Sequence, residues 1–287
     1  MQGKGFFEMT RKFTIALGQI AALGSRAETV DKAVRLTNEA ADQGADVIAF
    51  PEIAMTPFFP QYRADSRWFA ESEPIPGGLT CTKLQEVAAA RGIGVVVSIY
   101  ERAIEGVYYD TAAVIGKDGG LLGCQRMMHI AEEPLYNEKF YYKPGNSDYP
   151  VFDVGGVQIG VAVCQDQFFP EQIRILALHG AEVIMVPTAI SAETDPMLLA
   201  SQSGAVLNQV FFAGVNRVGT EGEMTFIGKS HVIDPLGEVR VISDRRDDHL
   251  LVHEIDVDFV TEVRRRQNYW FRDRRPETYG DLVKPLF

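Results

Sequence analysis

The sequence predicts an α/β protein folded as a four-layer α-β-β-α sandwich. Patterns typical of helices and of buried strands alternate along the chain, which indicates sheets covered by helices. An internal repeat is the second observation: residues 44–51 and 180–187 both read Gly-Ala-acid-Val-Ile, follow a predicted helix and end on proline. Two such halves, each with helices on one sheet face, bury their other faces against each other.

The 287 residues, 46% of them hydrophobic, can bury one large core, so we expect a single domain over residues 1–287. Helical spacing, glycine stops and continuous apolar runs locate the elements of the first half. These elements are a strand over Phe13–Gln19, a helix over Glu28–Gln43, a strand over Ala45–Phe50, a helix over Thr80–Arg91 and a strand over Val95–Ile99.

The middle of the chain changes to a hairpin followed by a polar, aromatic loop. The turn Lys117-Asp118-Gly119-Gly120 joins two strands between Val107 and Met127, because Asp-Gly and Gly-Gly tolerate positive φ. The elements that follow are a loop over His129–Tyr149, strands over Val151–Val154 and Val157–Val163, and a helix over Pro170–His179.

Charge and composition exclude several kinds of partner. A formal net charge of −11 repels phosphate backbones and anionic lipid, so neither nucleic acid nor a membrane is an expected partner. The chain shows no secretory signal pattern and no apolar run of about 18 residues, which predicts a cytoplasmic protein. Its three cysteines are far apart and odd in number, which favours reduced thiols.

Cys164 ends the apolar run Ile159–Val163 and precedes a helix start at Phe169-Pro170-Glu171. A nucleophile suits this strand-to-turn position, because the turn exposes the side chain beside backbone N–H groups that can hold an oxyanion. The alternative is a small buried hydrophobic residue, since unpaired cysteines are often fully buried. Position alone leaves both interpretations open.

Two glutamates are candidates for acid–base chemistry. Glu52 follows a strand that ends in Phe50-Pro51, where burying a carboxylate costs on the order of several kcal/mol unless it is paired or needed. It is a candidate base, with a cap or an ion-pair partner as the alternative. Glu138 lies among aromatic residues, and the sequence alone favours a loop carboxylate in water.

Seven motifs lie at residues 50–52, 126–130, 136–145, 160–166, 216–219, 228–237 and 272–279. Their residues, order and spacing resemble the nitrilase superfamily of carbon-nitrogen hydrolases, and together they span nearly the whole chain. Among the branches of that superfamily, the loop and the tail look most like the N-carbamoylputrescine amidase and β-ureidopropionase-like amidases. The resemblance implies the same four-layer sandwich.

The resemblance also implies hydrolysis of a linear amide or N-carbamoyl substrate through a cysteine thioester. In such a mechanism Cys164 attacks the carbon, Glu52 accepts the thiol proton and later activates water, and Glu138 orients the site. The backbone N–H of Gln165 and a lysine ammonium hold the oxyanion. No metal or organic cofactor is implied, and the expected partner is a small amide, carbamoyl or nitrile compound.

His129 and Tyr136 complete the implied set of substrate-binding residues. The family pattern Arg-Lys-x-His-Ile-Pro, aligned on Arg126 and His129, puts Met127 where the catalytic lysine belongs. Methionine can fill that slot, but it has neither a charge nor a useful hydrogen-bond donor. Loss of one oxyanion donor costs about 10²- to 10³-fold in rate, and loss of the cation raises the pKa of the Cys164 thiol.

Other cations are candidates to replace the lysine. Arg126 is a poor substitute, because adjacent strand residues point to opposite faces, whereas Lys139 and Lys229 reach the site only if the fold brings them there. Met127 has three explanations: an introduced substitution, a natural change to another thiol-dependent nitrile or amide reaction, or an inactive ligand-binding homologue. Retention of Cys164 and both glutamates favours an enzyme with impaired or altered chemistry.

The ends of the chain have their own predictions. Residues 1–11 form a short N-terminal extension, and about residues 264–287 resemble the C-terminal tail that lies at a two-fold interface in the family. This tail is rich in aromatic residues and arginine, as interface cores are. We therefore expect a homodimer or a larger homo-oligomer.

Overall fold

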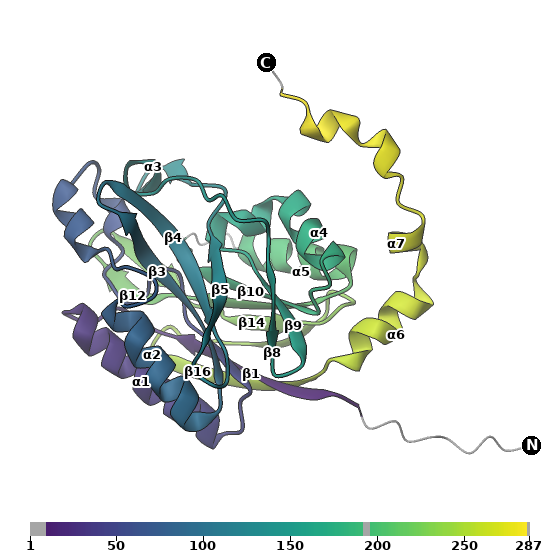
Figure 1. The fold of residues 1–287 in the computed structure, drawn as a ribbon, viewed down its shortest axis with the longest axis horizontal. Coiled ribbons are helices and arrows are strands. Elements are labelled where there is room, and N and C mark those ends of the chain that lie inside the picture. The colour runs from purple at the N-terminus through teal and green to yellow at the C-terminus, as the bar shows by residue number, and fades with distance from the viewer. Residues whose placement is uncertain (1–9, 192–195, 286–287) are drawn as a thin grey trace, which may run out of the picture.

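Two six-stranded sheets packed face to face form the centre of the molecule (Figure 1). The computed structural model describes residues 10–191 and 196–285. The first sheet has the order β16 (His249–Asp256), β1 (Lys12–Gln19), β2 (Val47–Ala49), β3 (Gly94–Ile104), β4 (Val107–Ile115) and β5 (Leu121–Arg126). The second has the order β15 (Val239–Ile242), β14 (His231–Ile233), β11 (Phe211–Asn216), β10 (Val183–Thr188), β9 (Val157–Val161) and β8 (Val151–Val154).

The two sheets repeat one topology. The central strands β1, β2 and β3 are parallel in the first sheet, as are β9, β10 and β11 in the second. The flanking strands are antiparallel in both. The order β16-β1-β2-β3-β4-β5 therefore matches β8-β9-β10-β11-β14-β15 strand for strand, which confirms the two similar halves.

Helices cover the outer face of each sheet and complete four layers. The first sheet carries α1 (Arg26–Asp42) and α2 (Leu79–Arg91), and the second carries α4 (Pro170–Leu178) and α5 (Pro196–Asn208). Successive side chains of a strand point to opposite faces of its sheet. In β1, Ile15 and Leu17 point into the core between the sheets, whereas Ala16 faces the helices. The predicted α-β-β-α sandwich is confirmed.

The segment 129–149 differs from the predicted loop. It contains β6 (Glu132–Glu133), β7 (Tyr136–Asn137) and the one-turn helix α3 (Glu138–Tyr141). The helix forms because the Tyr141 ring packs edge-on against Phe59, with ring centroids 5.0 Å apart, a contact between distant segments that local sequence does not reveal.

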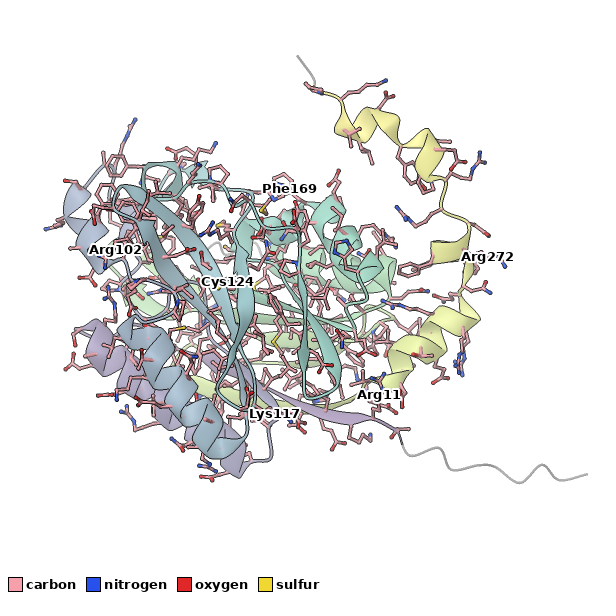
Figure 2. All side chains as sticks on the ribbon, viewed as in Figure 1. Arg11, Arg102, Lys117, Cys124, Phe169 and Arg272 are labelled. Carbon is pink, nitrogen blue, oxygen red and sulfur yellow. The ribbon has the colours of Figure 1, made fainter. Side chains whose placement is uncertain are left out.

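Short elements and the tail complete the described chain. The remaining elements are η1 (Phe59–Gln61), η2 (Ser66–Glu71), η3 (Cys164–Phe168), β12 (Val218–Glu221), β13 (Met224–Ile227), α6 (Asp258–Arg266), α7 (Tyr269–Arg272), η4 (Pro276–Thr278) and η5 (Gly280–Val283). From α6 onward the chain leaves the sandwich as an arc (Figure 1), and Arg272 lies on this arm (Figure 2). In the described segments, no helix combines the length and apolar character that a membrane span requires.

Packing of α4 against the second sheet gives a direct test of the layers. Leu176 is fully buried between α4 and the sheet, whereas Leu178 on the same helix is 45% exposed. We expect Leu176→Ala to lower the free energy of unfolding by about 2–5 kcal/mol, because it removes buried apolar atoms and leaves a cavity. Leu178→Ala is the matched control, with an expected change within about 0.5 kcal/mol. Equal urea midpoints for the two variants would contradict the layer assignment.

Candidate active site

The candidate nucleophile and base come from strand ends in opposite sheets. Glu52 follows β2 of the first sheet, and Cys164 follows β9 of the second. The backbone N–H of Glu52 donates to the carbonyl oxygen of Thr188, at the end of β10, over 3.3 Å. This bond joins the two sheets at the site. Glu52 is fully buried, and Cys164 is 6% exposed.

Cys164 begins the turn of η3 in a left-handed conformation, with φ +43°. A non-glycine residue adopts this conformation only where its surroundings enforce it. Here the buried Asp166 carboxylate accepts the backbone N–H groups of Val163 at 3.2 Å, Met128 at 3.1 Å and His129 at 3.0 Å. Asp166 thereby ties the turn that carries Cys164 to the segment that follows β5.

Burial and neighbouring carboxylates raise the pKa of the Cys164 thiol well above its ordinary value. Burial is the largest cause, followed by the charges of Glu52 and Glu138, with which the thiol shares its surroundings. A hydrogen bond from the backbone of Ala189 acts in the opposite direction. The thiol is therefore held in its protonated form, and a base must take its proton before it can attack.

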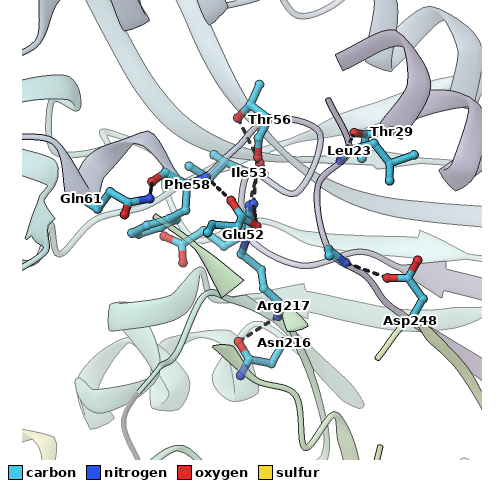
Figure 3. Close-up of polar contacts among 12 residues, drawn as sticks. Leu23, Thr29, Glu52, Ile53, Thr56, Phe58, Gln61, Asn216, Arg217 and Asp248 are labelled. Carbon is cyan, nitrogen blue, oxygen red and sulfur yellow. Dashed lines mark hydrogen bonds and ion pairs between the residues drawn. The ribbon is translucent and has the colours of Figure 1, made fainter. Parts of the chain in front are cut away.

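The loop that carries Glu52 is held by Arg217 (Figure 3). This fully buried guanidinium donates to three backbone carbonyl oxygens, those of Glu52 at 3.0 Å, Ile53 at 3.1 Å and Thr56 at 2.9 Å. Its charge is paired with Glu221 over 2.7 Å. The sequence marked residues 216–219 only as part of a family likeness, and it did not show that Arg217 positions the candidate base.

Three buried carboxyl groups meet at the site. Burial raises the pKa of Glu52 and of Glu138 well above their ordinary values, and each is raised further by a neighbouring carboxylate. Burial also raises the pKa of Asp110 to about 7. Several carboxyl oxygens of this cluster have no hydrogen-bond partner among the described residues other than the Cys164 thiol. They are both oxygens of Glu52, Oδ2 of Asp110 and Oε1 of Glu138.

Glu138 is not the solvated loop carboxylate that the sequence alone favoured. It is fully buried at the start of α3, where its Oε2 accepts the backbone N–H of Ala131 over 3.2 Å. The prediction was wrong because α3 folds onto the aromatic cluster and carries the carboxyl group inward. Asp110 was missed altogether, although one acid inside the apolar strand 107–115 was a visible signal.

Met127 lies fully buried in the core between the sheets. The preceding Arg126 pairs instead with Glu101 over 2.6 Å and lies 3.9 Å from the Tyr109 ring centroid. As predicted, adjacent residues point to opposite faces, so Arg126 does not serve the site. Lys139 is exposed on the outer side of α3, beside a cavity of about 690 Å³.

No described lysine or arginine is among the principal charges that shift the pKa values of Glu52, Asp110, Glu138 and Cys164. Burial is the largest cause of each shift, and carboxyl groups and hydrogen bonds are the others. Lys229 is half-buried between β13 and β14 and is likewise not one of these charges. In the described structure, neither Lys139 nor Lys229 is therefore a principal charge on the acid cluster.

The three implied binding residues differ in their surroundings. Tyr136 lies near Cys164 and Glu52, and burial raises its pKa; its hydroxyl donates to the carbonyl oxygen of Ala189 over 3.0 Å. His129 instead stacks on Phe169, with centroids 3.6 Å apart, and its Nδ1 lies 2.9 Å from Asp166. Gln165 follows Cys164 in the first turn of η3, where backbone N–H groups have no intrahelical acceptor.

Comparison with known proteins agrees with this architecture. The model of the carbon-nitrogen hydrolase family matches residues 14–265. The chain is 34% identical to N-carbamoylputrescine amidase from Solanum lycopersicum, over 96% of both chains. It is 31% identical to citrullinase from Francisella tularensis, over 94% of this chain and 98% of that enzyme.

A solved structure extends the comparison to three dimensions. The carbon-nitrogen hydrolase from Helicobacter pylori G27 superposes with a TM-score of 0.91 at 28% identity, covering 96% of this chain and all of that one. The similarity to the family model, to the relatives and to the solved structure covers both sheets. It includes the strand ends that carry Cys164 and Glu52. The chain therefore belongs to the carbon-nitrogen hydrolase family of the nitrilase superfamily, whose amidases are its named relatives.

Proposed function

We propose that this protein hydrolyses the carbon-nitrogen bond of a small linear amide or N-carbamoyl compound through a thioester on Cys164. The observation that carries the proposal is the meeting of a buried thiol, in an enforced turn, with the buried Glu52 carboxyl group, to which the thiol hydrogen-bonds. A carboxyl group within reach of a thiol that must lose its proton matches the requirements of nucleophilic catalysis.

The first half of the reaction forms the thioester. Glu52 accepts the thiol proton as the sulfur of Cys164 attacks the carbonyl carbon, and the backbone N–H of Gln165 hydrogen-bonds to the resulting oxyanion. The carbon-nitrogen bond then breaks, and the leaving nitrogen takes the proton from Glu52. Ammonia or an amine departs, and the acyl or carbamoyl group stays on the sulfur.

The second half releases the product. Glu52 accepts a proton from water as the water oxygen attacks the thioester carbon, and the carbon-sulfur bond breaks. The proton returns to the sulfur, so Cys164 and Glu52 are restored. An amide yields a carboxylic acid, whereas an N-carbamoyl group yields a carbamic acid that loses carbon dioxide. Glu138 orients the site through its bond to the Ala131 backbone.

Met127 makes this turnover slow or altered. The attack develops negative charge on sulfur and oxygen, and the described side chains whose charges most affect Cys164 and Glu52 are acids. Electrostatic stabilisation of the transition state is therefore weaker than a lysine at position 127 provides. The same observation supports a second candidate function, an inactive homologue that binds the same ligands without turnover.

A cytoplasmic location remains a prediction from the sequence.

The arm from α7 onward supports a homo-oligomer. Leu282 and Val283 are 65% and 85% exposed, and Tyr269, earlier on the same arm, is 47% exposed. Apolar side chains on an arm outside the body suit burial against a second copy of the chain. We infer a homodimer or a larger assembly in which residues 264–287 cover the neighbouring subunit, with residues 10–263 forming the body of one domain.

Removing the nucleophile tests the reaction. We expect the unaltered chain to release ammonia from at least one member of a panel of N-carbamoyl compounds, primary amides and nitriles, and Cys164→Ala to release none. Cys124→Ala is the matched control, because Cys124 lies on β5 with its side chain apart from the acid cluster. Ammonia release that survives Cys164→Ala would rule out the thioester route.

Restoring the cation tests the part played by Met127. We expect Met127→Lys to raise kcat/KM for ammonia release by about 10²- to 10³-fold, because it supplies an oxyanion donor and a positive charge. Met127→Leu preserves the apolar character and controls for packing, with no expected gain. If neither form turns over any compound, while ligands bind equally to the unaltered chain and to Cys164→Ala, the binding function replaces the proposed one.

Sedimentation tests the role of the arm. We expect a species of at least twice the 31.8 kDa chain mass at micromolar concentration. The paired change Leu282→Asp and Val283→Asp is expected to shift the population toward the monomer, because it places charge in an apolar contact. A purely monomeric profile of the unaltered chain would disprove the assembly.

A further inference from the structure

Asp110 and Met127 are cross-strand neighbours on the inner face of the first sheet. The β4–β5 register pairs Thr111 with Arg126, so the next pair outward is Asp110 with Met127, and the Met127 N–H donates to the Asp110 carbonyl oxygen over 2.9 Å. Side chains at directly opposite positions share a face and lie in contact range. The residue at position 127 therefore sets the charge next to Asp110.

The Asp110 carboxyl group is also fixed to the loop that carries Glu52. Ser98 donates from its hydroxyl to Oδ1 of Asp110 over 2.6 Å, and the same hydroxyl accepts the backbone N–H of Ile53 over 2.8 Å. Oδ2 of Asp110 accepts no hydrogen bond from a described donor, and it faces the neighbouring Glu52 carboxyl group. The two Glu52 oxygens likewise have no donor among the described residues other than the Cys164 thiol. Two adjacent carboxyl groups can form a hydrogen bond only if one of them carries a proton.

Among the described residues, the other groups that act on this pair are acids, the Cys164 thiol and hydroxyl groups. Asp166 acts on Asp110 as a negative charge, Glu138 acts on Glu52 in the same way, and the buried Tyr142 hydroxyl faces the same acids without a hydrogen-bond partner in the described structure. Isolated ionised carboxylates at full burial are too costly to persist, so such groups bind protons unless a cation is present. With methionine at position 127, protons are the available positive charge.

We propose that Asp110 and Glu52 share one proton at neutral pH, and that this proton takes the place of a positive charge at position 127. Asp110 is then a positioning residue that acts through Glu52. Its catalytic consequence rests on the proposed function, in which Glu52 is the base, whereas the shared proton itself is a property of the resting protein. A carboxyl pair with one proton resembles the acid dyads in which two adjacent carboxyl groups do not both ionise.

The sign of the effect on Cys164 follows from the same contacts. The Asp110 carboxylate raises the pKa of Glu52, and the Glu52 carboxylate in turn raises the pKa of the Cys164 thiol. Replacing Asp110 by asparagine removes the shared proton and supplies an N–H donor to Glu52, so the single negative charge of the pair then lies wholly on Glu52. The pKa of Glu52 falls, and the ionised Glu52 beside the thiol raises the pKa of Cys164, so Cys164 loses its proton at higher pH.

Infrared difference spectroscopy at pH 7 tests the shared proton on the full chain. We expect the wild-type minus Asp110→Asn spectrum to show a positive band of a protonated carboxylic acid. The wild-type minus Glu52→Gln spectrum shows the same band, because an amide at position 52 donates to Asp110 and leaves it ionised. Met127→Lys also loses the band, since the ammonium replaces the proton. Asp153→Asn, an exposed carboxyl on β8, is the control that retains it.

Alkylation of Cys164 by iodoacetamide, followed by peptide mass spectrometry from pH 6 to 10, provides the second readout. We expect the pH midpoint for Asp110→Asn to rise by about one pH unit, which is about tenfold slower labelling below the midpoint. The proposal is overturned if Asp110→Asn and wild type share one infrared spectrum and one midpoint, or if the band persists in Glu52→Gln. If Asp110→Asn does not fold, the Glu52→Gln and Met127→Lys spectra decide alone. These outcomes do not depend on turnover, so a failed ammonia assay leaves them unchanged.

Discussion

The contact between the Cys164 thiol and the Glu52 carboxyl group depends on how the two sheets meet. Each residue follows a strand of its own sheet, so neither sheet alone contains the pair. Burial of apolar side chains between the sheets, from Ile15 and Leu17 on one side to Val161 and Met185 on the other, holds the strand ends in register. The hydrophobic core thereby determines the geometry of the candidate chemistry.

Two buried polar side chains, Arg217 and Asp166, fix that geometry through hydrogen bonds to the backbone. Arg217 binds three backbone carbonyl oxygens of the loop that carries Glu52, and Asp166 accepts three backbone N–H groups around Cys164. Both side chains are fully buried, and their hydrogen bonds offset the cost of removing them from water. One guanidinium and one carboxylate thus fix the two loops that the proposed reaction needs.

The sequence predicted the layers because periodicity and turn chemistry are local. Strands β1 and β9, helices α1 and α2, and the hairpin turn at residues 117–120 were recognised from their own residues. The strand ends also indicated Cys164 and Glu52. For Cys164, burial as a small hydrophobic residue was an equally open interpretation, and for Glu52 a cap or an ion-pair partner was the more common role at such a position. The family likeness, with motifs over most of the chain, favoured chemistry over those alternatives.

The acids deeper in the site could not be predicted in the same way. Asp110 lies in an apolar strand, and nothing in its neighbours along the chain shows that Ser98 and Glu52 face it across the sheet. On sequence alone Glu138 was interpreted as a loop carboxylate in water, and only the family likeness placed it in the site, because the packing of α3 depends on Phe59, far away in sequence. Such contacts arise from the tertiary fold, and they determine which carboxyl groups are charged.

Met127 packs in the core between the sheets, and several buried carboxyl oxygens have no hydrogen-bond partner among the described residues. With methionine at that position, we propose that Cys164 acts as the nucleophile with Glu52 as its base. Acid-quenched mass spectrometry of the chain mixed with N-carbamoyl and amide substrates tests this proposal most directly. We expect a carbamoyl or acyl group on the Cys164 peptide, absent in Glu52→Gln. Product formation with the group on another residue, or with no group on Cys164 at any quench time, would contradict it.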